Sequence, residues 1–239
     1  MNKATISKHN VNDYAMTEAL NTVCGNLLFT GQQNKTILLT SCTKGEGKSY
    51  LSMEITENLA HRGLKVALID ADLRRSNFTK NYGVKLGGEK QGLAHYLAGY
   101  CKLEDALYET DIDGVYVIPN GRYVANPVPL ISGPVFADLM KTLSKEFDYV
   151  IVDAPPIGLV VDAAEMAHYC DGTIFVITYN QTRRRELADA KEQIEKSGCR
   201  ILGGIINQVT FEGISSKKYY YRYYYTKYGD EYYSYKSRK

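Results

Sequence analysis

The chain contains no long apolar run. A membrane-spanning helix needs about 18 consecutive apolar residues, and no segment of the 239-residue sequence approaches that length. Residues 1–10 also lack the apolar centre of a signal peptide. We therefore expect no transmembrane span and no leader, and a protein that stays in the cytoplasm.

Cysteine is scarce, with five in the whole chain. An odd number of widely spaced cysteines without a Cys-x-x-Cys pair argues against both a disulfide framework and a zinc site. We expect these side chains to be buried, reduced thiols: Cys24, Cys42, Cys101, Cys170 and Cys199.

An excess of either charge is also lacking overall, because 29 Lys and Arg nearly balance 27 Asp and Glu. With 44% hydrophobic and 23% charged residues, the composition is that of ordinary folded domains and excludes global disorder. The charge is nevertheless uneven. Residues 214–239 hold seven basic residues against Asp230 and Glu231, a local charge of +5, which leaves −3 for the rest of the chain.

Tyrosine is distributed even more unevenly than charge. Ten of the 21 tyrosines lie in this basic segment: Tyr219, Tyr220, Tyr221, Tyr223, Tyr224, Tyr225, Tyr228, Tyr232, Tyr233 and Tyr235. The shift in composition predicts three parts. These are an N-terminal extension over 1–12, one folded domain over 13–213, and a flexible, disordered tail over 214–239.

Short β-rich apolar runs alternate with helical patterns along the folded part. Such alternation predicts an α/β fold, a doubly wound and mainly parallel sheet with helices on both faces. The predicted strands are residues 36–40, 66–69, 115–118, 149–152, 173–178 and 201–206. The predicted helices cover residues 13–29, the segment from Leu51 to the stop signal at Gly63, and the segment from Leu187 to Gly198.

A glycine-containing loop joins the first predicted strand to its helix, where a phosphate-binding loop belongs in P-loop NTPases. Gly45 and Gly47 would let backbone N–H groups approach phosphate oxygens at the helix N-terminus. Lys48 would reach the β- and γ-phosphates, and Ser49 would place its hydroxyl on Mg²⁺. The general pattern asks for glycine where this chain has Cys42, so the match is incomplete. The alternative is a structural glycine-rich turn.

Three acidic residues follow two further strands. Asp70 and Asp72 come at the end of the second strand, and Asp153 ends the fourth. The carboxyl ends of parallel strands meet at one edge of the sheet, where ligands bind, so these acids could serve Mg²⁺ and accept a proton. Alternatively, the pair caps a helix and Asp153 is an ordinary turn residue. Asp162 and Asn207 are weaker candidates. The Asn207 amide could hydrogen-bond adenine, or the residue could simply belong to a turn.

The basic, tyrosine-rich tail allows three interpretations. Interleaved basic and aromatic residues could stack on single-stranded nucleic acid. A passive tail without a partner is a second possibility. A row of hydroxyls phosphorylated by a kinase site in the same chain is the sharper hypothesis.

Together the motifs resemble those of the bacterial tyrosine kinases of capsule and exopolysaccharide biosynthesis, of the CpsD/CapB type, from about residue 13 to the end. The family's phosphate loop also lacks the first glycine of the general pattern, and Lys44 stands in place of the family's proline. The paired-acid motif matches residues 70–75, with Ser76 where the family usually has proline. Residues 153–156 match a family Asp-x-Pro-Pro motif, and residues 126–127 match another family segment.

This resemblance implies an ATP- and Mg²⁺-dependent protein-tyrosine kinase that phosphorylates its own tail and regulates polysaccharide synthesis and export. It assigns Lys48 and Ser49 to ATP and Mg²⁺, Asp72 and Asp153 to the metal, and Asp70 to the tyrosine proton. The ten tail tyrosines become the phosphorylation sites. The expected nucleotide-binding residues are Lys44, Gly45, Glu46, Gly47, Lys48, Ser49, Tyr50 and Asn207.

The resemblance also implies partners. A separate transmembrane adaptor would recruit and activate the chain at the inner face of the plasma membrane, copies would phosphorylate each other, and a tyrosine phosphatase would reset them. No nucleic acid is expected. Family members usually carry Glu-x-x-Arg-x-x-Arg on the first helix for ring assembly, but here Asn21 and Cys24 replace both arginines after Glu18. Ring assembly through that contact is therefore in doubt.

Two rival hypotheses stay open. A ParA/MinD-type ATPase switch shares the expected fold, but its second lysine, five residues before Lys48, is Thr43 here, and Lys44 is one position away. An ATP-binding scaffold without catalysis is the other rival. The three intact acids argue against it.

Overall fold

The computed structural model describes residues 2–7, 14–31 and 33–209. The predicted tail and its phosphorylation sites therefore lie outside the described residues, as do residues 1 and 8–12 of the predicted N-terminal extension. The strands are β1 (Asn2–Thr5), β2 (Thr36–Ser41), β3 (Val66–Asp70), β4 (Lys85–Leu86), β5 (Tyr108–Glu109), β6 (Val115–Ile118), β7 (Tyr149–Asp153), β8 (Gly172–Thr178) and β9 (Ile201–Asn207). The helices are α1 (Tyr14–Phe29), α2 (Lys48–His61), α3 (Phe78–Asn81), α4 (Leu93–Leu97), α5 (Leu103–Ala106), α6 (Val128–Ile131), α7 (Pro134–Glu146), α8 (Asp162–Ala167) and α9 (Arg184–Lys196).

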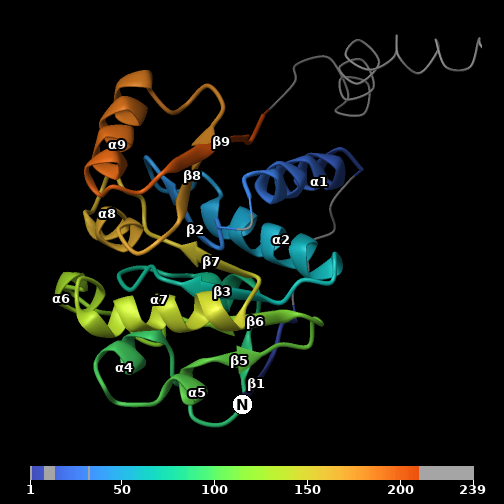
Figure 1. Ribbon diagram of the computed structural model, residues 1–239, viewed down its shortest axis with the longest axis vertical. Helices are drawn as coiled ribbons and strands as arrows, with labels where there is room; N and C mark the ends of the chain where they lie inside the picture. Colours follow the sequence, from blue (N-terminus) through green and yellow to red (C-terminus); the bar gives the residue numbers. More distant parts are fainter. Residues whose placement is uncertain (1, 8–13, 32, 210–239) are drawn as a thin grey trace, which may run out of the picture.

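One sheet runs through the molecule, with helices on both sides (Figure 1). Its strand order over the described residues is β4-β1-β5-β6-β3-β7-β2-β8-β9. The strands from β6 to β9 in this order run parallel, whereas β5 pairs antiparallel with β6, and β1 with β4. The predicted doubly wound, mainly parallel sheet is confirmed.

Alternate residues of the central strands pack into two separate cores. Leu38 of β2 faces one core and its neighbours Ile37 and Leu39 face the other, as the two-residue period of a strand requires. The first core includes residues of α7, α8 and α9, and the second includes residues of α1 and α2. Because β2, β3 and β7 are buried along their whole length, they read as continuous apolar runs rather than alternating ones.

The predicted strands and the three predicted helices are all present, with ends shifted by a few residues at most. Sequence analysis did not indicate β1, which pairs with both β5 and β4 and buries Ala4. It also did not indicate α7, whose N-terminus is set by Pro134 at its first position. All five cysteines are free thiols; Cys24, Cys42 and Cys199 are buried, and Cys101 and Cys170 are half-buried.

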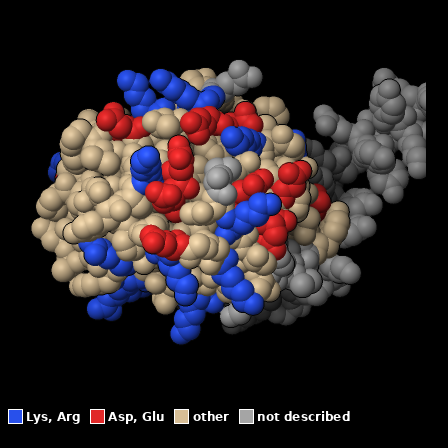
Figure 2. Space-filling model, turned by 90° about the horizontal axis from the view of Figure 1, so that it is seen from below, with Lys and Arg blue, Asp and Glu red and all other residues tan. Residues whose placement is uncertain are grey.

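The surface shows no separation of charge on the face nearest β1 and α5, where basic and acidic side chains are interspersed (Figure 2). Among the helices of the described part of the chain, none has the length and hydropathy that crossing a bilayer requires.

Candidate active site

The β2–α2 connection has the backbone of a phosphate-binding loop. Gly45 and Gly47 adopt φ values of +81° and +88°, a region that glycine enters without the steric cost other residues meet. Gly47 is the N-cap of α2, a helix of 14 residues, so the free N–H groups of its first turn lie at the end of the loop. Lys48, Ser49 and Tyr50 form that first turn and are half-buried, whereas Lys44 is exposed.

The carboxyl ends of β3 and β7 bring two acids together beside this loop. Asp70 and Asp153 end neighbouring parallel strands and stand opposite each other in register. Each is only 1% exposed. The Ser52 hydroxyl of α2 donates to Asp153 Oδ1 at 3.4 Å, which ties the second acid to the helix that begins at the phosphate loop.

Burial raises the pKa of both acids above the ordinary carboxyl value. The pKa of Asp70 is raised to about 8, first by burial and then by the neighbouring Asp153. Burial also raises the pKa of Asp153, opposed by the charge of Lys48 and a hydrogen bond from Ser49. Two carboxylates this close resist simultaneous ionisation unless a cation joins them.

Asp70 is held on one oxygen only. Its Oδ2 accepts hydrogen bonds from the Ser76 hydroxyl at 2.5 Å and from the Asn120 N–H at 3.3 Å. Its Oδ1 is buried and has no hydrogen-bond partner within the described residues. A buried carboxylate oxygen without a partner is costly, so it marks a place where a proton or a ligand is expected.

Asp72 lies two residues beyond β3 and is half-buried. Its Oδ1 accepts the N–H groups of Arg74 and Arg75 at 3.2 and 2.9 Å. These contacts close the turn that follows β3. The alternative from the sequence, that the pair caps the next helix, is not what the structure shows, because α3 begins at Phe78 with Asn77 as its N-cap. The two N–H contacts occupy Oδ1, so a metal-binding role for Asp72 would fall to Oδ2.

Asp162, a weaker candidate from the sequence, has a structural partner. Its carboxylate forms a two-point ion pair with Arg74, with Nε–Oδ2 and Nη2–Oδ1 distances of 2.7 and 3.0 Å. Arg74 Nη1 also donates to the Ala125 carbonyl oxygen at 2.9 Å. The pair joins the connections that follow β3, β6 and β7 at the edge where the acids lie.

Two other predicted nucleotide contacts, Glu46 of the loop and Asn207 at the end of β9, are joined by a hydrogen bond. The Asn207 amide donates to the Glu46 carbonyl oxygen at 2.8 Å. The Glu46 carboxylate is buried and accepts hydrogen bonds from Thr43 N–H at 2.9 Å, from Thr178 N–H at 3.3 Å and from the Thr182 hydroxyl. Both side chains therefore hold the loop itself.

The fold thus brings the predicted residues of the phosphate loop, the three acids and Asn207 to one edge of the sheet. Sequence reasoning missed Ser76, Asn120, Thr178, Thr182 and Gln208. Ser76 was visible as a departure from the family motif. The others carried no signal, because they act through backbone atoms or lie on connections whose meeting depends on strand order.

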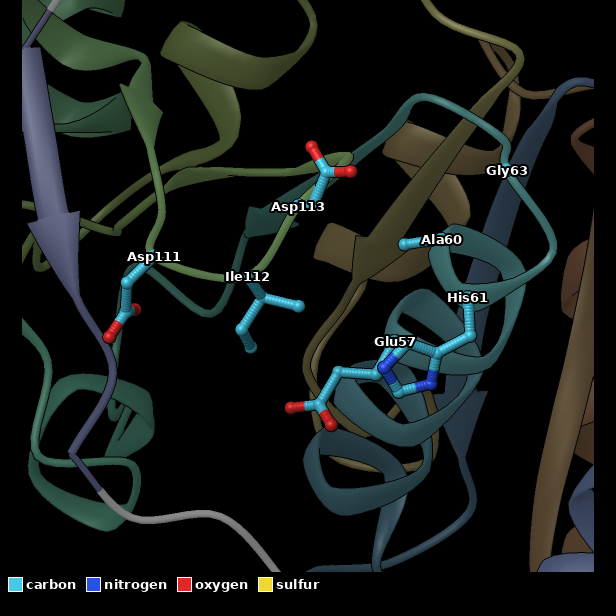
Figure 3. A pocket seen from close by; sticks show the side chains of 7 residues that line it. All are labelled: Glu57, Ala60, His61, Gly63, Asp111, Ile112 and Asp113. Atoms are coloured by element: carbon cyan, nitrogen blue, oxygen red, sulfur yellow. The ribbon is translucent and has the colours of Figure 1, made fainter.

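A hollow lies away from this edge, at the C-terminal half of α2 (Figure 3). Because α2 begins at Lys48 and a helix rises about 1.5 Å per residue, the hollow is most of a helix length from the loop. None of the predicted site residues lines it. Its lining residues come from α2, from the turn that follows it and from the connection between β5 and β6: Glu57, Ala60, His61, Gly63, Asp111, Ile112 and Asp113.

Known proteins are similar in sequence to this chain over most of its length. A family model described as an AAA domain matches residues 34–183. The tyrosine-protein kinase CpsD of Streptococcus agalactiae serotype Ia is 40% identical over 193 residues, which cover 81% of this chain and 82% of that protein. The putative tyrosine-protein kinase CapB of Staphylococcus aureus is 30% identical over 224 residues, covering 92% and 97%.

Solved structures separate the kinase hypothesis from its rival. The chimerical protein CapA2B2 superposes with a TM-score of 0.78 and 25% identity, covering 87% of this chain and 94% of that one. The septum site-determining protein MinD of Pyrococcus horikoshii, solved with Mg-ADP, gives a TM-score of 0.63 and 27% identity, covering 77% and 73%. The match to CapA2B2 extends further in both chains, and the sequence relatives are named tyrosine-protein kinases. The chain therefore belongs to the CpsD/CapB family of bacterial tyrosine-protein kinases.

Proposed function

We propose that this kinase binds ATP with Mg²⁺ at the β2–α2 loop and transfers the γ-phosphate to tyrosine, first to the ten tyrosines between Tyr219 and Tyr235 of another copy. The observation that carries the proposal is the in-register pair Asp70 and Asp153 beside the N-terminus of α2. It places two buried carboxylates next to a phosphate loop, which is what phosphoryl transfer to a hydroxyl requires.

The loop fits a triphosphate. Its two glycines with positive φ free the backbone N–H groups, and the N-terminal end of α2 attracts negative charge. Lys48 interacts electrostatically with Asp153 in the described structure. We expect its ammonium to turn to the β- and γ-phosphates when ATP binds.

The oxygen-rich edge fits Mg²⁺. No cluster of three acidic, histidine or cysteine side chains within the described residues is arranged to hold a metal ion by itself. Mg²⁺ is commonly bound by one or two carboxylates together with substrate phosphates and water. Ser49 and Asp153, which share a hydrogen bond, and the second oxygen of Asp72 would hold the ion. Bound Mg²⁺ would neutralise charge that builds up on the phosphates.

Asp70 is suited to accept the proton of the attacking tyrosine. A tyrosine hydroxyl has a pKa of about 10, and a base is more effective when its own pKa is raised towards that value, as burial does for Asp70. As the tyrosine oxygen bonds to the γ-phosphorus and the bond to the ADP oxygen breaks, the proton passes to Asp70. The unpartnered Oδ1 is the oxygen available for it.

The wider setting follows from the family. We propose that a separate transmembrane adaptor brings the chain to the inner face of the plasma membrane, that a tyrosine phosphatase reverses the modification, and that the target process is synthesis and export of capsular or exopolysaccharide.

The test is incubation of the purified chain with labelled ATP and Mg²⁺, followed by mass spectrometry of tail peptides. We expect phosphotyrosine between residues 219 and 235. Lys48→Met should abolish it without lowering the melting temperature, because a loop lysine serves phosphates rather than the core. Lys141→Met, at an exposed lysine of α7, is the matched control. Full labelling in Lys48→Met, or ATP hydrolysis without phosphotyrosine in the unaltered chain, would contradict the proposal.

A further inference from the structure

Residues at and just after the ends of β8 and β9 form hydrogen bonds with the phosphate loop. Glu46 extends its carboxylate to the Thr178 N–H and the Thr182 hydroxyl after β8. From the end of β9, Asn207 donates to the Glu46 carbonyl oxygen, and Gln208 Nε2 donates to the Gly45 carbonyl oxygen at 2.8 Å. These five residues, Glu46, Thr178, Thr182, Asn207 and Gln208, form what we call the loop clamp.

The clamp leaves little freedom to the peptide groups that would face phosphate. Glu46 is 2% exposed, and its Oε2 accepts the Thr43 N–H at 2.9 Å, closing the loop on itself. A Cβ at Gly47 would lie 2.2 Å from Asn207 Nδ2, so the Asn207 side-chain amide packs closely against the N-cap of α2. The orientation of the loop N–H groups is thus set by side chains from other strands.

Backbone strain points to the same two connections. Among the described residues, Asn180 and Gln208 are the non-glycine residues with positive φ, each at +56°. This conformation is tolerated by asparagine and uncommon for glutamine. One lies between Thr178 and Thr182, and the other is itself a clamp residue. Strained residues persist where surrounding contacts hold them and tend to mark functional sites.

We propose that Thr182, through Glu46, is a positioning residue for nucleotide binding: the β8–α9 connection holds the phosphate loop in its binding conformation without touching the phosphates. This inference rests on the proposed nucleotide site. Thr182 lies 136 positions after Glu46 in the sequence and has no place in any phosphate-loop motif. Its hydroxyl donates to the Glu46 carboxylate and accepts the Thr178 N–H at 3.2 Å, and the Glu46 contact links it to the phosphate loop.

The substitutions separate positioning from folding. Thr182→Val keeps the shape of the side chain but removes its hydroxyl, and Thr182→Ser keeps the hydroxyl. Loss of a hydrogen bond to a buried charge is worth roughly tenfold or more in an equilibrium constant. We therefore expect Thr182→Val to weaken ADP binding about tenfold, and Thr182→Ser to bind like the unaltered chain. Glu46→Gln should weaken it too, because one amide hydrogen would face a backbone donor in place of a lone pair.

The experiment is calorimetric titration of full-length protein with Mg-ADP, with a thermal melt of each variant and a KM and kcat measurement for ATP. We expect KM to rise about tenfold in Thr182→Val while kcat changes less than twofold, since the clamp shapes the groove before the chemical step. The double variant Glu46→Gln with Thr182→Val should lose less than the two single losses combined. Ser132→Ala is the control, because it removes a similar contact, to Glu165 at 2.8 Å, between α6 and α8.

Equal ADP affinity in Thr182→Val and the unaltered chain would overturn the inference, as would equal losses in Thr182→Val and Thr182→Ser. Either result would leave the kinase proposal standing. If the unaltered chain bound no Mg-ADP at all, the nucleotide site itself would be wrong.

Discussion

Asp70 is a carboxylate placed where its charge is poorly solvated. Its pKa of about 8 lies above the ordinary 3.8, so the unfolded chain releases this proton more readily than the folded one. The raised pKa therefore costs folding stability in a pH-dependent way. The cost is absent below the unfolded pKa, grows as pH rises from about 4 and is complete once pH exceeds about 8. The acid that is expected to serve catalysis therefore lowers stability at neutral and alkaline pH.

Replacing this charge should stabilise the protein. In the absence of nucleotide and metal, Asp70→Asn should raise the melting temperature by roughly several degrees at pH 8 and by less at pH 5, because asparagine does not titrate. Scanning calorimetry at both pH values measures the difference. Asp138→Asn, at an exposed carboxylate of α7, should show no such trend. A gain in Asp70→Asn that is the same at both pH values would show that charge is not the cause.

Substitutions of Asp70 and Asp72 should have different kinetic effects. Asp70→Asn removes the proton acceptor and should mainly reduce the single-turnover rate, by at least about a hundredfold. Asp72→Asn should also weaken nucleotide binding and raise the Mg²⁺ concentration required, because it removes a ligand charge. Titration of Mg²⁺ under single-turnover conditions distinguishes them. Identical Mg²⁺ curves for the two variants would remove the division of roles.

At the scale of elements, the β7–α8 connection packs directly on the phosphate loop. A Cβ at Gly158 would lie 2.3 Å from the Cys42 carbonyl oxygen, and the Ile157 N–H donates to the Ser41 carbonyl oxygen at 2.9 Å. Close approach of these two backbones fixes the start of the loop. Cys42 itself is not among the residues with positive φ, so this position does not need the conformational freedom of glycine.

Gly158→Ala should force these segments apart. We expect a loss of about 1–3 kcal/mol in unfolding free energy together with weaker Mg-ADP binding. Gly25→Ala is the matched control: it lies inside α1 with nothing within 4 Å of the added Cβ, so it should stabilise by about 0.5–1 kcal/mol and leave binding unchanged. Denaturant unfolding and ADP titration test both. Normal ADP affinity in a destabilised Gly158→Ala would mean that this packing supports the fold alone.

The elements that sequence predicted are those with a strong local pattern. Buried strands such as Val66–Asp70 are continuous β-rich runs, and α2 repeats Leu51, Ile55 and Leu59 on one face. The short β1 and β5 have two to four residues each, too few to show a period. The phosphate-loop residues and the acids could be predicted because they come at or just after strand ends, and local patterns locate those ends. The contacts of Thr182 and Gln208 depend on β8 lying beside β2 and β9 beside β8. No local pattern specifies that order.

At the scale of the whole molecule, α1 is engaged within its own chain. Cys24 is fully buried against α2, and Asn21 accepts hydrogen bonds from Asn58 and Arg62 of the same protein. By the resemblance described above, members of the family usually have arginines at these two positions, and those arginines serve ring assembly. An arginine at 24 would not fit this packing, so association through that helix face should be weak and other contacts should matter more.

The tail is another contact that the sequence predicts, and phosphorylation would change its charge. Each phosphate adds about −1.5 to −2 charge, so three or four bring the +5 segment to zero or below. We expect oligomers of the unmodified chain that dissociate on phosphorylation and in high salt, because attraction to the −3 remainder is lost or screened. Light scattering with and without ATP, at low and high salt, measures this.

A variant with all ten tail tyrosines replaced by phenylalanine is the control, since it should respond to salt and not to ATP. A mass that is the same in all four conditions would rule out a charge switch. A salt-resistant ring would show that α1 assembles in another way.

The loop clamp also fixes when during synthesis the kinase can become active. The phosphate loop leaves the ribosome early, but β7 follows more than a hundred positions later and Asn207 and Gln208 later still. Pairings across such separations close late because long loops must be ordered first. A nascent chain therefore holds an incomplete nucleotide site until β9 and Gln208 have emerged. Partly made chains should neither consume ATP nor modify neighbouring proteins, so the order of the strands protects the cell from an unregulated kinase fragment.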